Sequence, residues 1–428
     1  MTAEIAILNK MAVALAADSA VTIGRPPNIK IYNTVNKIFE LSSCEPVGIM
    51  VYGRLDFMGV PYEPLIKEYR RSIGDLKFDY IGEYVDHFKE YLKTITFSEE
   101  ESRKNIVFCL ADRFSELSQD IESALIRRIR DDGKFLKSKI NGMAQTAIRA
   151  EITKLQRASF ANGFNRVVLP TGYTGVVDIL IDRHFEHHYP NKATRELLHK
   201  LAGYLLAKDE LSGSRTGIVI AGFGQREMLP TLISFETDGI IDGKLKWHAE
   251  PAVDIKRSGP EAEILGFAQD DMIRSFLDGV DPYLRDYFEE LIESSIRTTT
   301  DMLFGAFTNS DDEKGRAINA FEGTLKKIVA DLKDKADEKI KTSSSNPIRD
   351  MIRSMPKQEL ATLATSLVEV TSLKRKVSRM QETVGGEVDV AVISKSEGFV
   401  WIQRKHYFPS ELNGRFFVRQ KLATEQRR

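Results

Sequence analysis

The stretch that decides the fold is residues 2–22, TAEIAILNKMAVALAADSAVT. It holds two short, alanine-rich apolar runs, residues 3–8 and 11–17, joined at Asn9-Lys10 in the manner of a β-hairpin. Asp18 follows the second run directly, and a loop begins there. The sequence therefore predicts that the chain opens with a buried β-hairpin that ends in a carboxylate.

The composition argues against disulfide-rich, nucleic-acid-binding and membrane-spanning proteins. The chain has 428 residues, enough for a large core without disulfides, and its two cysteines, Cys44 and Cys109, cannot build a disulfide framework. Its 61 basic and 62 acidic side chains nearly cancel, which argues against a nucleic-acid partner. No basic leader and no apolar run of membrane-spanning length is present, so we expect a cytoplasmic protein without a membrane partner.

Beyond the first hairpin, blocks of strand pattern alternate with blocks of helix pattern. This order favours one α+β domain with helical insertions over three independent domains. The predicted division is residues 1–74 (core, first part), 75–162 (helical insertion), 163–279 (core, central part), 280–350 (helical insertion) and 351–428 (core, C-terminal helix and strands).

Three local features sharpen this prediction. Thr237-Asp238-Gly239 lies between two strand patterns and predicts a hairpin turn. Residues 342–347, Thr-Ser-Ser-Ser-Asn-Pro, predict a linker or loop. Residues 358–377 predict an amphipathic helix. Its apolar stripe consists of Leu360, Leu363, Leu367, Val370 and Leu373.

Thr2 is the most informative residue for chemistry. A small second residue permits removal of Met1, which would leave Thr2 with a free α-amino group. Such an amine, with a reference pKa of about 7.7–8.0, can accept the proton of the neighbouring hydroxyl near neutral pH. A nearby cation would lower that pKa further. A threonine at this position is common, so its meaning depends on the residues around it.

Those residues resemble a known family. Residues 2–22, followed by Asn36-Lys37 in 35–41, resemble the opening of proteasome β subunits and of the bacterial HslV peptidase, which are N-terminal-nucleophile (Ntn) hydrolases. Residues 217–239 are similar to the central hairpin of that family, and residues 266–279 look more like its Anbu branch. Residues 358–393, with Gly385-Gly386, resemble its late helix, Gly-Gly turn and edge strands.

The resemblance implies a role for each of four residues. Thr2 would be the nucleophile, and its own amine would be the base. Asp18 would orient a cationic Lys37, which would tune Thr2 electrostatically. The backbone N–H of Gly53 would help to bind the oxyanion, and a glycine lets the substrate carbonyl approach closely.

The resemblance also implies a fold and an activity. The fold would be a four-layer αββα sandwich with large helical insertions. The activity would be that of a threonine-type peptidase that cleaves amide bonds in peptides or unfolded proteins, without cofactor or metal. Family members assemble into rings and often rely on a partner ATPase, so we expect a homo-oligomer.

The sequence departs from the family just before the Gly-Gly turn. The family has an Asp and a Ser there, whereas this chain has Gln381 and Val384. That difference favours an alternative function, a catalytically silent proteasome-like scaffold that binds partners through its helical insertions. A third alternative is an Ntn amidase that acts on a small molecule.

One further cluster has the residue types of a metal site, namely Asp182, His184, Glu186, His187 and His188. The adjacent Tyr189-Pro190 indicates a loop, and no distant Cys/His pair completes a ligand set. We therefore interpret the cluster as a solvated polar turn.

Overall fold

A computed structural model describes residues 3–23, 30–132, 137–167, 169–250, 252–256, 259–307, 311–377, 385–406, 408–415 and 417–419. The strands are β1 (Ala3–Asn9), β2 (Val13–Ala17), β3 (Val21–Ile23), β4 (Lys30–Tyr32), β5 (Ile38–Glu40), β6 (Val47–Gly53), β7 (Asp56–Phe57), β8 (Val60–Pro61), β9 (Thr216–Gly222), β10 (Thr231–Ile241), β11 (Lys244–Ala249), β12 (Val253–Asp254), β13 (Ala262–Ala268), β14 (Asp389–Ser394) and β15 (Gly398–Gln403).

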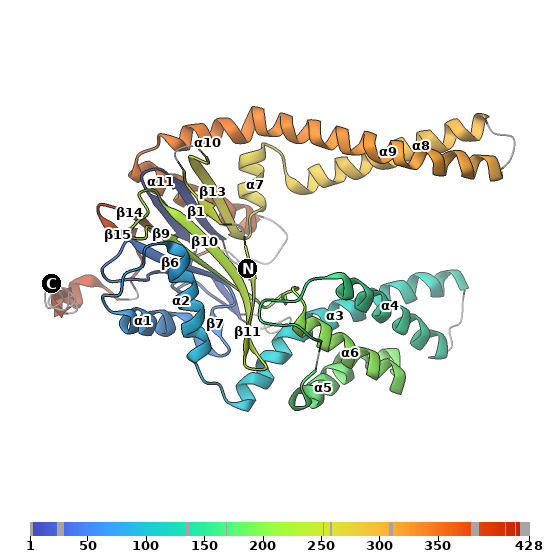
Figure 1. Cartoon of the computed structure of the whole chain (residues 1–428), viewed down its shortest axis with the longest axis horizontal. Coiled ribbons are helices and arrows are strands. Elements are labelled where there is room, and N and C mark those ends of the chain that lie inside the picture. Colours follow the sequence, from blue (N-terminus) through green and yellow to red (C-terminus); the bar gives the residue numbers. More distant parts are fainter. Residues whose placement is uncertain are drawn as a thin grey trace. The chain divides into compact units, whose positions relative to one another are not determined.

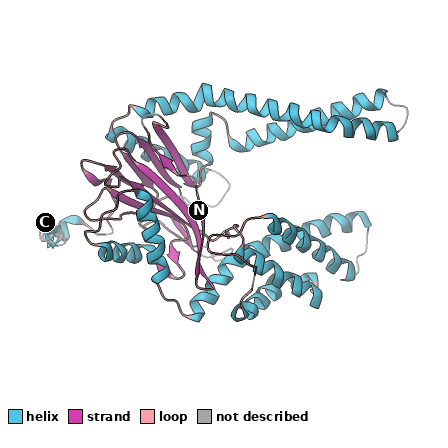
Figure 2. Ribbon diagram, viewed as in Figure 1, coloured by secondary structure: helices cyan, strands magenta, loops and turns pink. Residues whose placement is uncertain are grey.

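The long helices are α1 (Tyr62–Ile73), α2 (Ile81–Thr94), α3 (Glu99–Asp132), α4 (Lys137–Arg157), α5 (Thr174–Phe185), α6 (Lys192–Ala207), α7 (Asp271–Asp278), α8 (Pro282–Phe307), α9 (Asp311–Ile340), α10 (Asn346–Arg353) and α11 (Lys357–Val377). Short helical turns are η1 (Thr171–Tyr173), η2 (Glu186–His188), η3 (Lys341–Ser345) and η4 (Ser410–Leu412). The chain is thus an α+β protein (Figures 1 and 2), as the sequence predicts.

The chain divides into two compact units. The first comprises residues 1–34, 255–392 and 402–428, and the second comprises residues 35–254 and 393–401. These two units do not test the predicted division into a core and two helical insertions, which stays a prediction.

The predicted N-terminal hairpin is confirmed and lies at the centre of an antiparallel sheet of the first unit. β1 pairs with β2 on one side and with β13 on the other, and the strands of this unit follow the order β13-β1-β2-β14. One face of β1 and β2, including Ile5, Ile7 and Ala14, packs in a core cluster with α11. Small alanines suit this face because a helix packs closely against it.

The second unit is built around its own antiparallel sheet, of order β11-β10-β9-β6-β5. Helices α1 and α2 cover one face through an aromatic-rich core that includes Tyr69, Tyr84 and Phe88. In the same unit, α3, α4, α5 and α6 form a helical bundle whose core is a separate apolar cluster (Figure 1).

The predicted turn at Thr237-Asp238-Gly239 is wrong. Strand β10 continues to Ile241, and the hairpin turn is Asp242-Gly243, where both residues have positive φ, 51° and 72°. A two-residue turn with two positive φ angles matches the twist of the flanking strands. Asp238-Gly239 instead lies at an irregularity of the β10–β11 ladder, between Thr237 and Gly239.

The predicted linker at residues 342–347 is also wrong, because this segment is helical. It forms the π-helical turn η3 and the start of α10, directly after α9 (Figure 1). The hydroxyls of Thr342 and Ser343 donate to backbone carbonyls one turn earlier, those of Glu338 and Lys339. These bonds accommodate hydroxyl residues in a helix, and Pro347 falls in the first turn of α10, where it is tolerated.

The predicted helix at residues 358–377 is confirmed as α11, but its buried stripe differs. Leu360 and Leu367 are buried as expected, whereas Val370 and Leu373 are exposed. The buried positions instead include Ala361, Ala364, Val368 and Thr371. The small side chains let α11 lie close to β1 and β2, which leucines alone would not allow.

Candidate functional site

Asp18 is the best-defined residue of the predicted catalytic set. It follows β2, and only 1% of its surface is exposed. One carboxylate oxygen, Oδ1, accepts a hydrogen bond from the backbone N–H of Ala3 at 3.1 Å. The other, Oδ2, accepts from the N–H of Ala20 at 3.2 Å and from that of Gly385 at 2.9 Å. The carboxylate therefore holds the residue that directly follows Thr2.

The Gly385-Gly386 turn belongs to the same network. The N–H of Ser19 donates to the carbonyl of Gly385 at 3.1 Å, and the Ser19 hydroxyl donates to the carbonyl of Glu387. Gly386 has a φ of +78°, and a Cβ there would lie 2.8 Å from the carbonyl oxygen of Asn33. Only glycine fits such a position. The turn is thus fixed against the loop that follows β2.

Lys37 and Gly53 lie on neighbouring strands of the second unit. Lys37 directly precedes β5, is 1% exposed, and accepts a backbone hydrogen bond from Val51 at 2.9 Å. Gly53 ends β6 with a φ of +76°, and a Cβ there would lie 2.5 Å from the carbonyl oxygen of Arg215. A side chain at position 53 is therefore excluded by backbone geometry and by space.

The predicted site residues thus divide between the units. Asp18 belongs to the first unit, and Lys37 and Gly53 belong to the second. Thr2 lies outside the described residues, as do Gln381 and Val384. Within the units, the structure brings Asp18 to Ala3 and Gly385, and Lys37 to the strand that ends in Gly53.

Sequence reasoning missed Glu4. This carboxylate is fully buried on β1, where it lies opposite Ala17 on β2 and Phe267 on β13. The signal was present, because Glu4 is the one charged residue in the apolar run of residues 3–8. A buried carboxylate requires polar partners, so an acid within an apolar strand is a candidate site residue.

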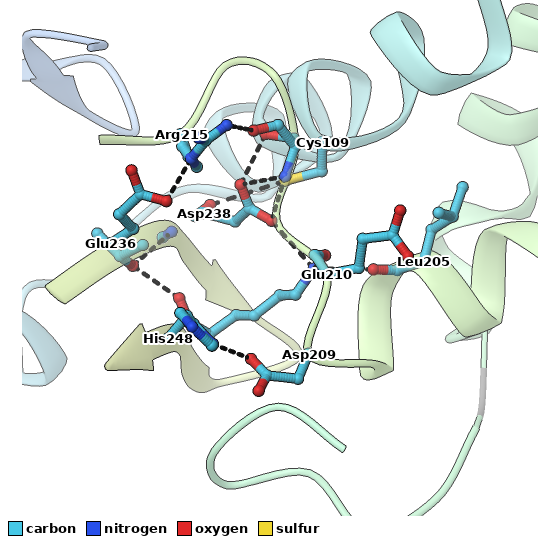
Figure 3. Close-up of polar contacts among 12 residues, drawn as sticks. Cys109, Leu205, Asp209, Glu210, Arg215, Glu236, Asp238 and His248 are labelled. Atoms are coloured by element: carbon cyan, nitrogen blue, oxygen red, sulfur yellow. Dashed lines mark hydrogen bonds and ion pairs between the residues drawn. The ribbon is translucent and has the colours of Figure 1, made fainter. Parts of the chain in front are cut away.

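The second unit contains a buried ion pair that the sequence did not reveal (Figure 3). Lys246 and Asp238 are joined at 3.0 Å, and both side chains are 1% exposed. The ammonium of Lys246 also donates to the carbonyls of Leu205 at 2.8 Å and Glu210 at 2.7 Å. Its three hydrogens are thus used, and the pair connects β10 and β11 to α6 and to the segment that follows it.

A small cavity, about 10 Å³ in volume, lies beside Asp238, with Arg54, Asn105 and Cys109 in its wall. The Arg54 guanidinium is engaged, because it pairs with Asp56 at 2.6 Å and donates to Asn105 at 3.1 Å. Burial, and next the charge of Asp238, raises the pKa of the Cys109 thiol. The wall thus presents neither a free cation at Arg54 nor a thiolate at Cys109.

The histidine-rich segment is engaged in protein contacts. Asp182 pairs with Arg195, and the ring of His188 lies 2.9 Å from the Ser118 hydroxyl. Burial lowers the pKa of His188, so its ring is neutral at physiological pH. Among the described residues, no three potential metal-ligating acids, histidines or cysteines come together. Nor does the described part of the chain contain a helix that is long and apolar enough to cross a membrane.

Comparisons with known proteins add little. No protein-family profile matches the chain, and no curated protein does. Among solved structures, the helical assembly of the Anbu complex from Pseudomonas aeruginosa aligns with 99% of this chain and 96% of its own, at 10% identity and a TM-score of 0.28. A likeness at this TM-score and identity assigns neither a family nor a function to the chain.

Proposed function

We propose that this chain is a proteasome-like N-terminal threonine hydrolase that cleaves amide bonds in peptides or unfolded proteins after Met1 is removed. The observation that carries the proposal is the Asp18 carboxylate, which is buried and accepts the backbone N–H of Ala3. A buried carboxylate at this point holds the first residue of β1. It also places a negative charge at the residue that follows the proposed nucleophile in the sequence.

The proposed mechanism uses the chain's own groups. The α-amine of Thr2 accepts the hydroxyl proton, and the hydroxyl oxygen attacks the substrate carbonyl carbon. The N–H of Gly53 stabilises the oxyanion, and the proton passes from the amine to the leaving nitrogen as the C–N bond breaks. Water, activated by the same amine, then hydrolyses the ester and restores Thr2.

The role proposed for Lys37 is electrostatic. A lysine that is 1% exposed keeps its charge only beside acceptors or an anion, and Asp18 is the proposed anion. The cation would lower the pKa of the Thr2 amine, which raises the fraction of free base at neutral pH.

We also propose the four-layer αββα arrangement. Each unit has a sheet with helices on one face. The opposite faces are apolar too, with Ala6, Leu8 and Leu15 in the first unit and Met50 and Val219 in the second. Apolar side chains on both faces of a sheet require cover on both faces. Stacking of the two sheets would supply it.

The proposal extends to partners and location. By its family resemblance, the chain would act in the cytoplasm as a homo-oligomer that takes unfolded chains from a partner ATPase. It would need no cofactor and no metal, since the amine and hydroxyl of one residue supply base and nucleophile.

A second candidate function is the catalytically silent scaffold. Gln381 and Val384, in the places of a family Asp and Ser, are the observation that favours it. A small-molecule amidase is the third candidate, and a monomeric protein with an open site would favour that one.

The test is intact-mass spectrometry of the purified full chain before and after treatment with a threonine-directed electrophile. We expect a mass without Met1 and one covalent adduct that Thr2→Ala abolishes and Thr2→Ser retains. Asp18→Asn should remove most of the labelling, because the amide replaces one acceptor oxygen by a donor that faces a backbone N–H.

If Met1 is retained, the α-amine of Thr2 is blocked, and this result would contradict the hydrolase proposal. So would a free Thr2 that gives no adduct. Either result would move the assignment to the scaffold. If the protein reacts with the electrophile, a peptide-cleavage assay then distinguishes the two enzymes. Cleavage indicates the peptidase, and no cleavage indicates the small-molecule amidase.

A further inference from the structure

The helix α8 packs against α9 along its inner side. Ion pairs join the two helices at Arg285–Asp337, Lys333–Glu289 and Arg297–Glu322. The ring of Phe304 on α8 meets that of Phe321 on α9 edge to face, with 5.8 Å between the ring centroids. Leu325 and Val329 of α9 are buried. The hairpin of α8 and α9 therefore has its own interior.

The outer side of α8 is exposed and largely uncharged, with Asp301 at its edge. We call it the α8 stripe. It begins with large apolar side chains and continues with hydroxyl residues, at the spacing of three and four that marks one helix face. Its members are Tyr283 (72% exposed), Leu284 (53%), Tyr287 (58%), Phe288 (52%), Leu291 (45%), Ser294, Ser295, Thr298, Thr299 and Met302 (70%).

Three of the four hydroxyl residues of the stripe use their hydroxyls within the helix. Ser294 donates to the carbonyl of Leu291, Thr298 to that of Ser294, and Thr299 to that of Ser295, at 2.8–3.0 Å. These hydroxyls are satisfied within the helix. Burying polar groups usually costs free energy because donors lose their partners. These three hydroxyls would keep theirs when the stripe is covered.

The size of the stripe matches an interface. With roughly 200 Å² for a fully exposed residue of these types, its apolar members expose about 700 Å². That is close to the roughly 800 Å² that each partner contributes to a standard protein–protein interface, and above what most monomers leave in one patch.

We propose that the α8 stripe is covered by the same stripe of a second copy of this chain, with the two helices antiparallel. A two-fold axis at Leu291 pairs Tyr283 with Thr299, Leu284 with Thr298, Tyr287 with Ser295 and Phe288 with Ser294. In these four pairs a large side chain faces a Ser or Thr, while Leu291 faces its own copy at the axis, so the surfaces interdigitate. The stripe complements itself in size, as a two-fold interface requires.

This inference concerns assembly and stands without the catalytic role of Thr2. Thr2→Ala should therefore leave the assembly unchanged. The first test is sedimentation of the full chain, which we expect to be a dimer or a larger even-numbered assembly at roughly 10 µM.

Leu291→Glu would place two carboxylates together at the axis. We expect it to halve the sedimenting mass and to raise the dissociation constant at least about 30-fold. Ile328→Glu is the matched control, because Ile328 is an exposed apolar residue on α9, outside the stripe. It should leave the mass unchanged. Far-UV circular dichroism confirms that both variants are folded.

The predicted register has its own test. Ser294→Phe and Phe288→Ser should each weaken the dimer, and the double variant should restore it, because position 288 faces position 294 across the axis. In a Cys44→Ser background, a short bis-maleimide should link Leu291→Cys into covalent dimers but should not link Ile328→Cys.

A wild-type chain that is monomeric at roughly 100 µM would overturn the proposal. So would an assembly that Leu291→Glu leaves intact. Failure of the double variant to recover, with Leu291→Glu still disruptive, would overturn the antiparallel register.

Discussion

At the scale of single residues, Lys246 shows what a buried charge requires. Its three ammonium hydrogens go to Asp238 and to two carbonyls, and neither member of the pair reaches solvent. Asp238 in turn accepts from the backbone and the hydroxyl of Ser212. Such a pair gives little net stability, but the loss of one partner leaves a buried charge uncompensated.

Lys246→Met should therefore lower the free energy of unfolding by about 3–5 kcal/mol. In the double variant with Asp238→Asn the stranded charge is gone, so it should be more stable than Lys246→Met alone. Urea denaturation followed by circular dichroism measures both. A loss below about 1 kcal/mol for Lys246→Met would show that Asp238 finds another cation or solvent.

Cys109 gives a pH prediction. Its pKa lies above the usual value because the thiol is buried and Asp238 is near, so it stays protonated between pH 7 and 9. We expect Ellman's reagent to modify only Cys44, which is exposed, in the native protein, and both thiols in urea. Cys44→Ser should abolish the native reaction. A second native thiol that reacts faster as pH rises would contradict the buried, protonated state.

The residues of the candidate site show where sequence reasoning ends. Sequence reasoning named Asp18 through the resemblance. It could not find the bond from Gly385 to Asp18, because 367 residues separate them and only the pairing of β2 with β14 brings them together. It also missed Glu4, since an apolar strand pattern does not reveal which groups lie near a single acid in the folded chain.

At the scale of secondary structure, long periodic segments were predictable and turns were not. The hairpin β1–β2 and the helix α11 follow from residue patterns alone. The position of the β10–β11 turn does not follow from them, because this segment contains two Asp-Gly pairs, Asp238-Gly239 and Asp242-Gly243, and local chemistry fits both. Tertiary contacts decide between them, since Asp238 must remain on β10 to reach Lys246.

The turn itself can be tested at Asp242, whose φ is 51°. Asp242→Val should lower the free energy of unfolding by about 1–2 kcal/mol, because a β-branched residue pays a steric cost at positive φ. Asp242→Asn is the control and should be close to neutral, since asparagine tolerates this conformation. Equal urea midpoints for the valine and asparagine variants would argue against the assigned turn.

At the scale of the whole molecule, the α8–α9 hairpin is set apart from the rest of the first unit. The chain enters and leaves it at neighbouring points, because Ser345 donates to the carbonyl of Leu277 at 3.2 Å and Ser344 lies against Gly279. The hairpin also has its own interior of ion pairs and rings. These features make it a separable part.

Replacement of residues 282–340 by a short Gly-Ser linker should leave the remaining chain folded, with a cooperative urea transition whose midpoint shifts little. The same variant should lose self-association, as Leu291→Glu does. Circular dichroism and sedimentation test the two halves of this prediction. A variant that loses its cooperative transition would show that the hairpin stabilises the first unit.

The strand order of the first sheet has a consequence for synthesis. β1 and β2 leave the ribosome first, yet their neighbours β13 and β14 begin only at Ala262 and Asp389. At about 5–20 residues per second, the opening hairpin waits roughly 20–80 s for its last partner. During that interval the apolar faces of the hairpin lack the strands that later cover its edges, and the removal of Met1 that the proposed role of Thr2 requires has time to take place.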